Sequence, residues 1–161
     1  MRALRIAFAV TTALLTASVA LQLYFAGMGV FSHGEELWGP HTFNGRVVLP
    51  ALILLSIALA AASRAGRRTV WLSVLLVPLL LMQTLIFIIT GLLTGTGPDT
   101  VDPPLVAVMM VSLHPLNGLV ILSVAFVVAR RAWRRAFPST RPGTGGEPVD
   151  ARERREPASS V

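Results

Sequence analysis

The chain has 161 residues, of which 53% are hydrophobic and only 14% are charged. With a mean hydropathy of +0.68, this composition lies outside the range of ordinary soluble domains and predicts a membrane protein. The net charge is +6, but the basic residues form short clusters beside apolar runs, without interleaved aromatic residues, which argues against nucleic acid as a partner. Because the chain has no cysteine, it can form no disulfide, no thiolate metal site and no covalent thioether bond to haem.

The apolar runs predict four membrane spans, because a helix of about 20 apolar residues crosses the hydrocarbon core of a bilayer. The second run is short, so its helix is expected to begin upstream, where Pro40 suits a first helical turn. The predicted fold is all-α, a polytopic four-helix membrane bundle within residues 1–136. Its spans are expected at about residues 6–31, 41–62, 70–93 and 104–129.

The two ends of the chain need separate interpretations. The first run also resembles a secretory signal with a small-residue cleavage site at residues 17–20, but it stays apolar as far as Phe31, which favours a membrane span. Residues 137–161 are rich in Pro, Gly, Ser, Arg and Glu. Such a segment buries too little apolar surface to offset its ordering entropy, so a disordered cytoplasmic tail is expected.

The distribution of arginine predicts how the spans are oriented. Lysine is absent, and most arginines that flank the predicted spans fall on one side of the membrane: Arg2, Arg5, Arg64, Arg67, Arg68, Arg130, Arg131, Arg134 and Arg135. The opposite side carries Glu35, Glu36, Asp99 and Asp102, with Arg46 its lone basic residue. Because cytoplasmic loops carry the positive excess, we expect a multi-pass protein of the bacterial plasma membrane with both termini in the cytoplasm.

A histidine motif occurs twice in the chain. His41–Gly45 reads His-Thr-Phe-Asn-Gly and opens the second predicted helix, while His114–Gly118 reads His-Pro-Leu-Asn-Gly within the fourth. A glutamine lies in the helix before each motif, Gln22 in the first and Gln83 in the third. This pattern favours two repeated helical hairpins around a shared site, although the spacings from glutamine to histidine, 19 and 31 residues, require different loops.

The spacing within the motif suits haem. A histidine and a glycine four residues later share one helix face, so the imidazole projects while the missing side chain lets a flat macrocycle approach. Neutral imidazole is an axial ligand of haem iron, and bundles place such ligands on facing helices. The hypothesis is a haem b whose iron is bound by His41 and His114, beside Gly45 and Gly118. Equal depth of the two histidines requires the fourth helix to continue beyond residue 129.

Other roles for the histidines stay open. A histidine within the membrane can hydrogen-bond across helices, as Gln83 and Asn117 can. That favours a non-catalytic accessory or structural membrane protein, which is the first interpretation of the sequence, with the haem protein as its alternative. The expected partners are the lipid bilayer and another membrane protein or, for the haem protein, a redox partner. A divalent metal bound outside the membrane is a further alternative, although its candidate ligands have no fixed spacing: His33, Glu35, Glu36 and His41. No catalytic residue is predicted, because the acidic residues fall in loops or the tail.

Several residues occur in a recognisable order: Gln22, Ala26–Phe31, Trp38, His41, Gln83 and Leu113–Asn117. Over about residues 5–130 this order resembles an uncharacterised family of small four-span bacterial membrane proteins, a domain of unknown function. The histidines of the second and fourth helices are also distantly similar to one four-helix half of the haem A synthase family. That family's catalytic carboxylate has no counterpart here, because Gly39 and Pro40 precede His41. The second resemblance therefore implies only haem ligation by His41 and His114.

Overall fold

The computed structural model describes residues 1–32, 37–97 and 100–138, and within these ranges the chain is helical with no strand. The elements are α1 (Arg2–Phe31), α2 (Trp38–Phe43), the π-helix η2 (Asn44–Val48), α3 (Leu49–Ala62), α4 (Arg67–Thr94), α5 (Leu105–Val111) and α6 (Leu113–Ala136). Because α2, η2 and α3 follow one another directly, and α5 is separated from α6 by one residue, the described chain has four helices of membrane-spanning length and composition. The predicted all-α four-helix membrane bundle is confirmed.

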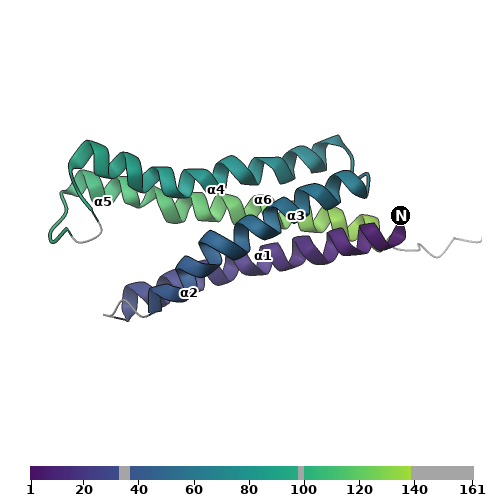
Figure 1. Cartoon of the computed structure of the whole chain (residues 1–161), viewed down its shortest axis with the longest axis horizontal. Helices are drawn as coiled ribbons and strands as arrows, with labels where there is room; N and C mark the ends of the chain where they lie inside the picture. Colours follow the sequence, from purple (N-terminus) through teal and green to yellow (C-terminus); the bar gives the residue numbers. More distant parts are fainter. Residues whose placement is uncertain (33–36, 98–99, 139–161) are drawn as a thin grey trace, which may run out of the picture.

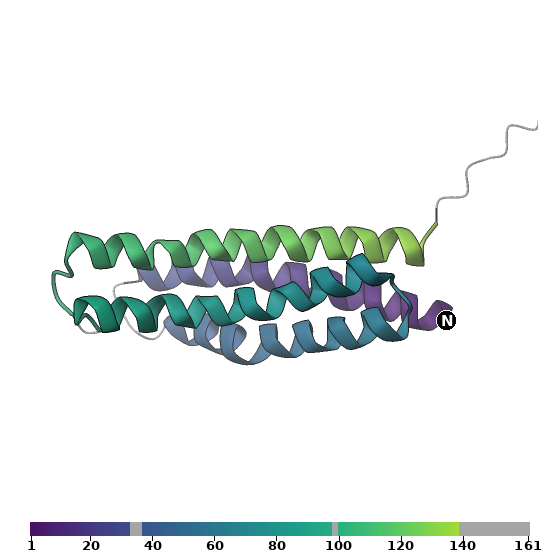
Figure 2. The ribbon, with the colours of Figure 1, turned by 90° about the horizontal axis from the view of Figure 1, so that it is seen from above.

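The helices form two antiparallel hairpins, one of α1 with α2–α3 and one of α4 with α5–α6. Helix α1 packs against α3 and α6, and α4 packs against the same two helices, so α3 and α6 occupy opposite corners of the bundle. Figures 1 and 2 show the N-terminus, the α3–α4 turn and the end of α6 together at one end. At the other end the two hairpins diverge in the view of Figure 1. The arginine-rich segments thus share one end of the molecule.

Small and branched side chains fill the centre of the bundle. One buried cluster includes Leu15, Ile53, Leu76 and Ile121, and another, nearer the arginine-rich end, surrounds Phe8. Many large apolar side chains on the outside are exposed in the fold, as expected for helices whose outer surface meets lipid tails instead of water. Buried hydroxyls bond to carbonyls of the preceding helical turn, as in Ser73 to Thr69 at 3.1 Å, which satisfies them without water.

Prolines explain two irregularities of the second and fourth spanning helices. Pro115 has no N–H and crowds the carbonyl four residues earlier, at Val111, and α5 ends at Val111. Pro50 acts in the same way on the carbonyl of Arg46, which lies within the π-helix Asn44–Val48. Both distortions lie beside the repeated motif. Pro78, in contrast, lies inside the continuous helix α4.

The helix ends differ from the predicted span limits. The second spanning helix begins at Trp38, three residues before the expected start, and the fourth ends at Ala136, seven residues beyond residue 129. Hydropathy marks the apolar core of a span, whereas arginines and aromatic residues extend the helix through the interface. Because α6 extends to Ala136, His41 and His114 lie at more nearly equal depths along the bundle, as joint ligation of one haem requires. The expected tail, apart from Phe137 and Pro138, lies outside the described residues.

Candidate functional site

The two histidine motifs meet across the bundle. His41 lies on α2 and His114 lies in the first turn of α6, at opposite corners, yet their ring centroids are 6.2 Å apart with the ring planes inclined by 52°. Both side chains are half-buried. The rings therefore connect the two hairpins near the end where the hairpins diverge (Figure 1).

A polar network orders the histidine of the first hairpin. Asn44 donates from Nδ2 to the Ser18 carbonyl at 3.0 Å and to Gln22 Oε1 at 2.8 Å. The Ser18 hydroxyl in turn donates to Asn44 Oδ1 at 2.7 Å. Gln22 donates from Nε2 to the His41 carbonyl at 3.0 Å. These bonds tie α1 to α2 and η2, and they satisfy polar groups that have no water to bind inside a membrane.

The second hairpin repeats the two bonds donated by the asparagine, here between α6 and α4. Asn117 donates from Nδ2 to the Leu79 carbonyl at 2.8 Å and to Gln83 Oε1 at 3.0 Å. The accepting carbonyl lies four residues before the glutamine in both hairpins, at Ser18 and at Leu79. The predicted repeat of two helical hairpins is thus present as a repeat of hydrogen bonds. The unequal spacings in the sequence are absorbed by the connection between α4 and α6.

Each histidine is held through the same ring nitrogen. His41 Nδ1 lies 3.2 Å from the Gln22 carbonyl oxygen, and His114 Nδ1 lies 3.3 Å from the Gln83 carbonyl oxygen. Because a carbonyl oxygen can only accept, Nδ1 carries the hydrogen and Nε2 of the neutral ring keeps its lone pair. This is the arrangement that histidine ligands of metals commonly adopt, with the second nitrogen bonded to a carbonyl.

The surroundings of the two Nε2 atoms differ. His41 Nε2 lies 3.2 Å from the Gln22 side-chain nitrogen, which can donate to it. Gln83 makes no such contact with His114 among the described residues. Consequently the first imidazole is bonded at both nitrogens within its own hairpin, and the second is bonded at one.

Two further aromatic rings extend the histidine pair, and the sequence did not predict this role for them. Trp38 meets His41 edge-on at a centroid distance of 5.4 Å, and Phe87 meets His114 at 4.9 Å. The Trp38 indole also lies on Gly29, where an added Cβ would come within 2.5 Å of the ring. The small residues before Phe31 are the signal that a bulky ring packs there. Nothing in the sequence distinguishes Phe87 from other apolar residues of α4.

The two motif glycines face glutamine. A Cβ added at Gly45 would lie 2.8 Å from the Gln22 side-chain nitrogen, and one added at Gly118 would lie 3.5 Å from that of Gln83. Packing against Gln22 is therefore sufficient reason for glycine at position 45, whereas a Cβ at Gly118 would make only ordinary van der Waals contact with Gln83. Their predicted place beside a macrocycle stays a prediction.

The structure describes only His41 among the candidate ligands of a divalent metal. Arg46, one position after Gly45, is exposed. His33, Glu35 and Glu36, proposed with His41 for a divalent metal, lie outside the described residues. Among the residues that the structure describes, no group of three or more His, Cys, Asp or Glu side chains could hold a metal ion.

Comparison with known proteins gives a family and no activity. No curated protein and no solved structure matches the chain, and the distant resemblance to haem A synthase stays a prediction. The segment that matches a family model begins at Gln22 of the first network and ends within the third spanning helix, α4. Residues 22–91 match the model of a Family of unknown function (DUF6220), so over this segment the chain is similar to a family without an assigned function, as its sequence predicts.

Proposed function

We propose that the protein is a membrane-embedded haem b protein that carries electrons, with His41 and His114 as the two ligands of the iron. The observation that carries this proposal is the separation of 6.2 Å between the two ring centroids. Two imidazoles on opposite sides of one metal ion, each with a metal–nitrogen bond of about 2 Å, have ring centres about 6 Å apart. An inclination of 52° between the ring planes is compatible with such a site, because each imidazole would be free to turn about its own bond to the iron.

The residues present fit this group in two further respects. Both histidines bind a backbone carbonyl through Nδ1, which fixes the ring and leaves Nε2 as the ligating atom. They also project from opposite corners of the bundle. Because α2 and α6 have no backbone contact among the described residues, the two imidazoles are joined across a wide separation of their helices, as ligands on either side of one group would be. For His41 to act as a ligand, the Gln22 amide must release its Nε2, while the bond of the same amide to the His41 carbonyl at 3.0 Å can remain.

When bound, haem b supplies one-electron chemistry. The chain itself contributes an apolar helix bundle, ring-positioning carbonyls and the aromatic rings of Trp38 and Phe87 beside the histidines. We place the protein in the bacterial plasma membrane as a multi-pass protein with both termini in the cytoplasm, because the arginine-rich end follows the positive-inside rule. A redox partner is expected at the opposite end, near the histidines.

The test is an absorption spectrum of the detergent-purified protein from haem-replete cells, oxidised and then reduced with dithionite. A reduced b-type spectrum is expected for the wild-type chain, with loss of the six-coordinate signature in His41→Ala and in His114→Ala. His33→Ala, which changes the third histidine of the chain, is the matched control and should keep the wild-type spectrum. A protein that stays colourless after haem addition overturns the proposal.

A second candidate is a non-catalytic accessory or structural membrane protein, and one observation favours it. In the first hairpin, Gln22 and His41 satisfy each other's polar atoms without any ligand. In this role the histidines join helices to one another, and replacing either one lowers stability but changes no colour. A colourless wild-type protein with destabilised histidine variants would support this function.

A further inference from the structure

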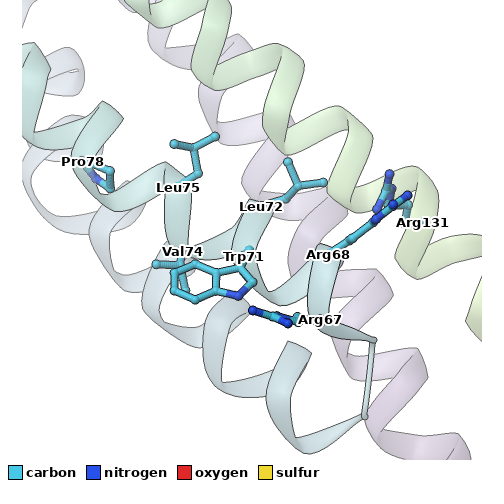
Figure 3. Close-up of a pocket in the computed structure, with 8 residues that line it drawn as sticks. All are labelled: Arg67, Arg68, Trp71, Leu72, Val74, Leu75, Pro78 and Arg131. Carbon is cyan, nitrogen blue, oxygen red and sulfur yellow. The ribbon is translucent and has the colours of Figure 1, made fainter.

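An open groove lies on the lipid-facing side of α4, near the arginine-rich end and away from the histidines. Its volume is about 740 Å³, and Figure 3 shows the side chains that line it. They are Arg67, Arg68, Trp71, Leu72, Val74, Leu75 and Pro78 of α4 and Arg131 of α6. The groove is therefore basic where α4 begins and apolar farther along the helix.

The length of the groove corresponds to part of one bilayer leaflet. Arg67 and Pro78 are 11 positions apart, which is about 16 Å of α-helix, close to half the hydrocarbon thickness of a bilayer. Trp71 and Leu75 are 61% and 43% exposed, so in a membrane they contact lipid. A tryptophan of this kind marks the interface between head groups and tails.

The positive charge at the mouth of the groove has no protein counterpart in the part of the chain that the structure describes. Arg67, Arg68 and Arg131 make no ion pair with the described residues, whereas Arg135 nearby donates to the Arg64 carbonyl at 3.1 Å. Guanidinium groups match phosphate oxygens in geometry and charge. Basic pockets between helices near the membrane surface are suited to anionic head groups.

We propose that this groove is a binding site for one anionic phospholipid. The head-group phosphate lies between the guanidinium groups of Arg68 and Arg131, with the charge of Arg67 beside Trp71 adding to the attraction (Figure 3), and one acyl chain follows α4 past Leu72 toward Pro78. Some lipid covers this face in any membrane, and the positive charge of the arginines makes an anionic lipid bind more tightly than a neutral one. The site is independent of the histidine pair and does not depend on haem.

Tryptophan quenching by brominated lipid tests the proposal in the intact chain. In the variant Trp38→Phe/Trp133→Phe, Trp71 is the sole tryptophan, since the chain has three. The variant is placed in nanodiscs of fixed phosphatidylglycerol and phosphatidylcholine content, with bromine on the chains of one lipid or the other. Trp71 is expected to be quenched with an apparent preference of about tenfold for the anionic lipid. A variant that keeps only Trp38, which is 38% exposed and lies at the opposite end of the bundle, is the control and should show no preference.

Charge-neutralising variants separate a built site from general attraction to a basic surface. Arg68→Gln/Arg131→Gln should lose the preference at Trp71, while Arg2→Gln, at the same end but outside the groove, should keep it. Far-UV circular dichroism checks that each variant is folded. The proposal is overturned if the double variant shows the same preference for anionic lipid as the parent protein with Trp71 alone. It is also overturned if Arg2→Gln loses as much of that preference as the double variant.

Discussion

The glycines of the two motifs allow a matched test of the polar networks. The change is Gly45→Ala, with Gly118→Ala as its counterpart in the other hairpin. A Cβ at Gly45 would lie 2.8 Å from the Gln22 side-chain nitrogen, closer than such atoms can approach, whereas the nearest atom to a Cβ at Gly118 is 3.4 Å away, at Leu23. The end of a glutamine side chain moves easily unless hydrogen bonds hold it. At Gln22 they do.

Moving Gln22 breaks its bond to the His41 carbonyl and the bond that it accepts from Asn44. Interhelical bonds in membranes contribute about 0.6 kcal/mol each on average, with a maximum near 1.7, so the loss is about 1–2 kcal/mol. Alanine offsets about 0.5–1 kcal/mol of this through its better helix propensity. We therefore expect Gly45→Ala to be destabilised by about 1 kcal/mol and Gly118→Ala to be unchanged or slightly stabilised.

The assay is reversible unfolding by SDS in mixed micelles, followed by far-UV circular dichroism. Both variants change the same residue type in the same motif, so the difference between them reports the environment of each glycine. Equal destabilisation of the two variants would refute the reasoning, because it would mean that glycine is required for a reason common to both motifs, such as a shared macrocycle.

Three further predictions concern polar and aromatic packing. Ser56 is fully buried and its hydroxyl has no partner among the described residues, so Ser56→Ala should raise the free energy of unfolding by about 1 kcal/mol. Ser73→Ala removes a hydroxyl that is hydrogen-bonded and should not raise it, and the same SDS titration measures both variants. Asn117→Ala removes two bonds to α4 and should cost about 1–2 kcal/mol in that titration, a result that an unchanged midpoint would contradict. Gly29→Ala should push the Trp38 indole outward and lower the free energy of unfolding by about 1–3 kcal/mol. In a variant whose sole tryptophan is Trp38, the substitution should also change the fluorescence spectrum. An unaltered spectrum and an unaltered unfolding midpoint would count against this contact.

The sequence predicted the spans and the pairing of the motifs, because both depend on short patterns. Apolar length is enough to identify a helix that crosses a bilayer. The repeated His-x-x-Asn-Gly and the preceding glutamines indicated two hairpins around one site, and the structure brings His41 and His114 together. The fold was therefore more predictable than in a soluble protein, where apolar runs are shorter and ambiguous.

The partners inside each network could not be predicted from the motif. Ser18 donates to Asn44, but its residue type is common in membrane helices and only the rotation of α1 brings it to face η2. The role of Phe87 depends likewise on the rotation of α4. The π-helix was missed because a one-residue change in hydrogen-bond register leaves the apolar pattern nearly unaltered. These features depend on tertiary packing, which single-sequence patterns do not report.

The repeat of hydrogen bonds has a consequence for biosynthesis. Every bond of the first network joins residues between Ser18 and Asn44, so the first hairpin can complete it before α4 leaves the ribosome. The second network, between Leu79 and Asn117, is equally self-contained. Each half can therefore enter the membrane as a finished unit, and two separately translated halves, divided in the turn between α3 and α4, should reassemble into one bundle.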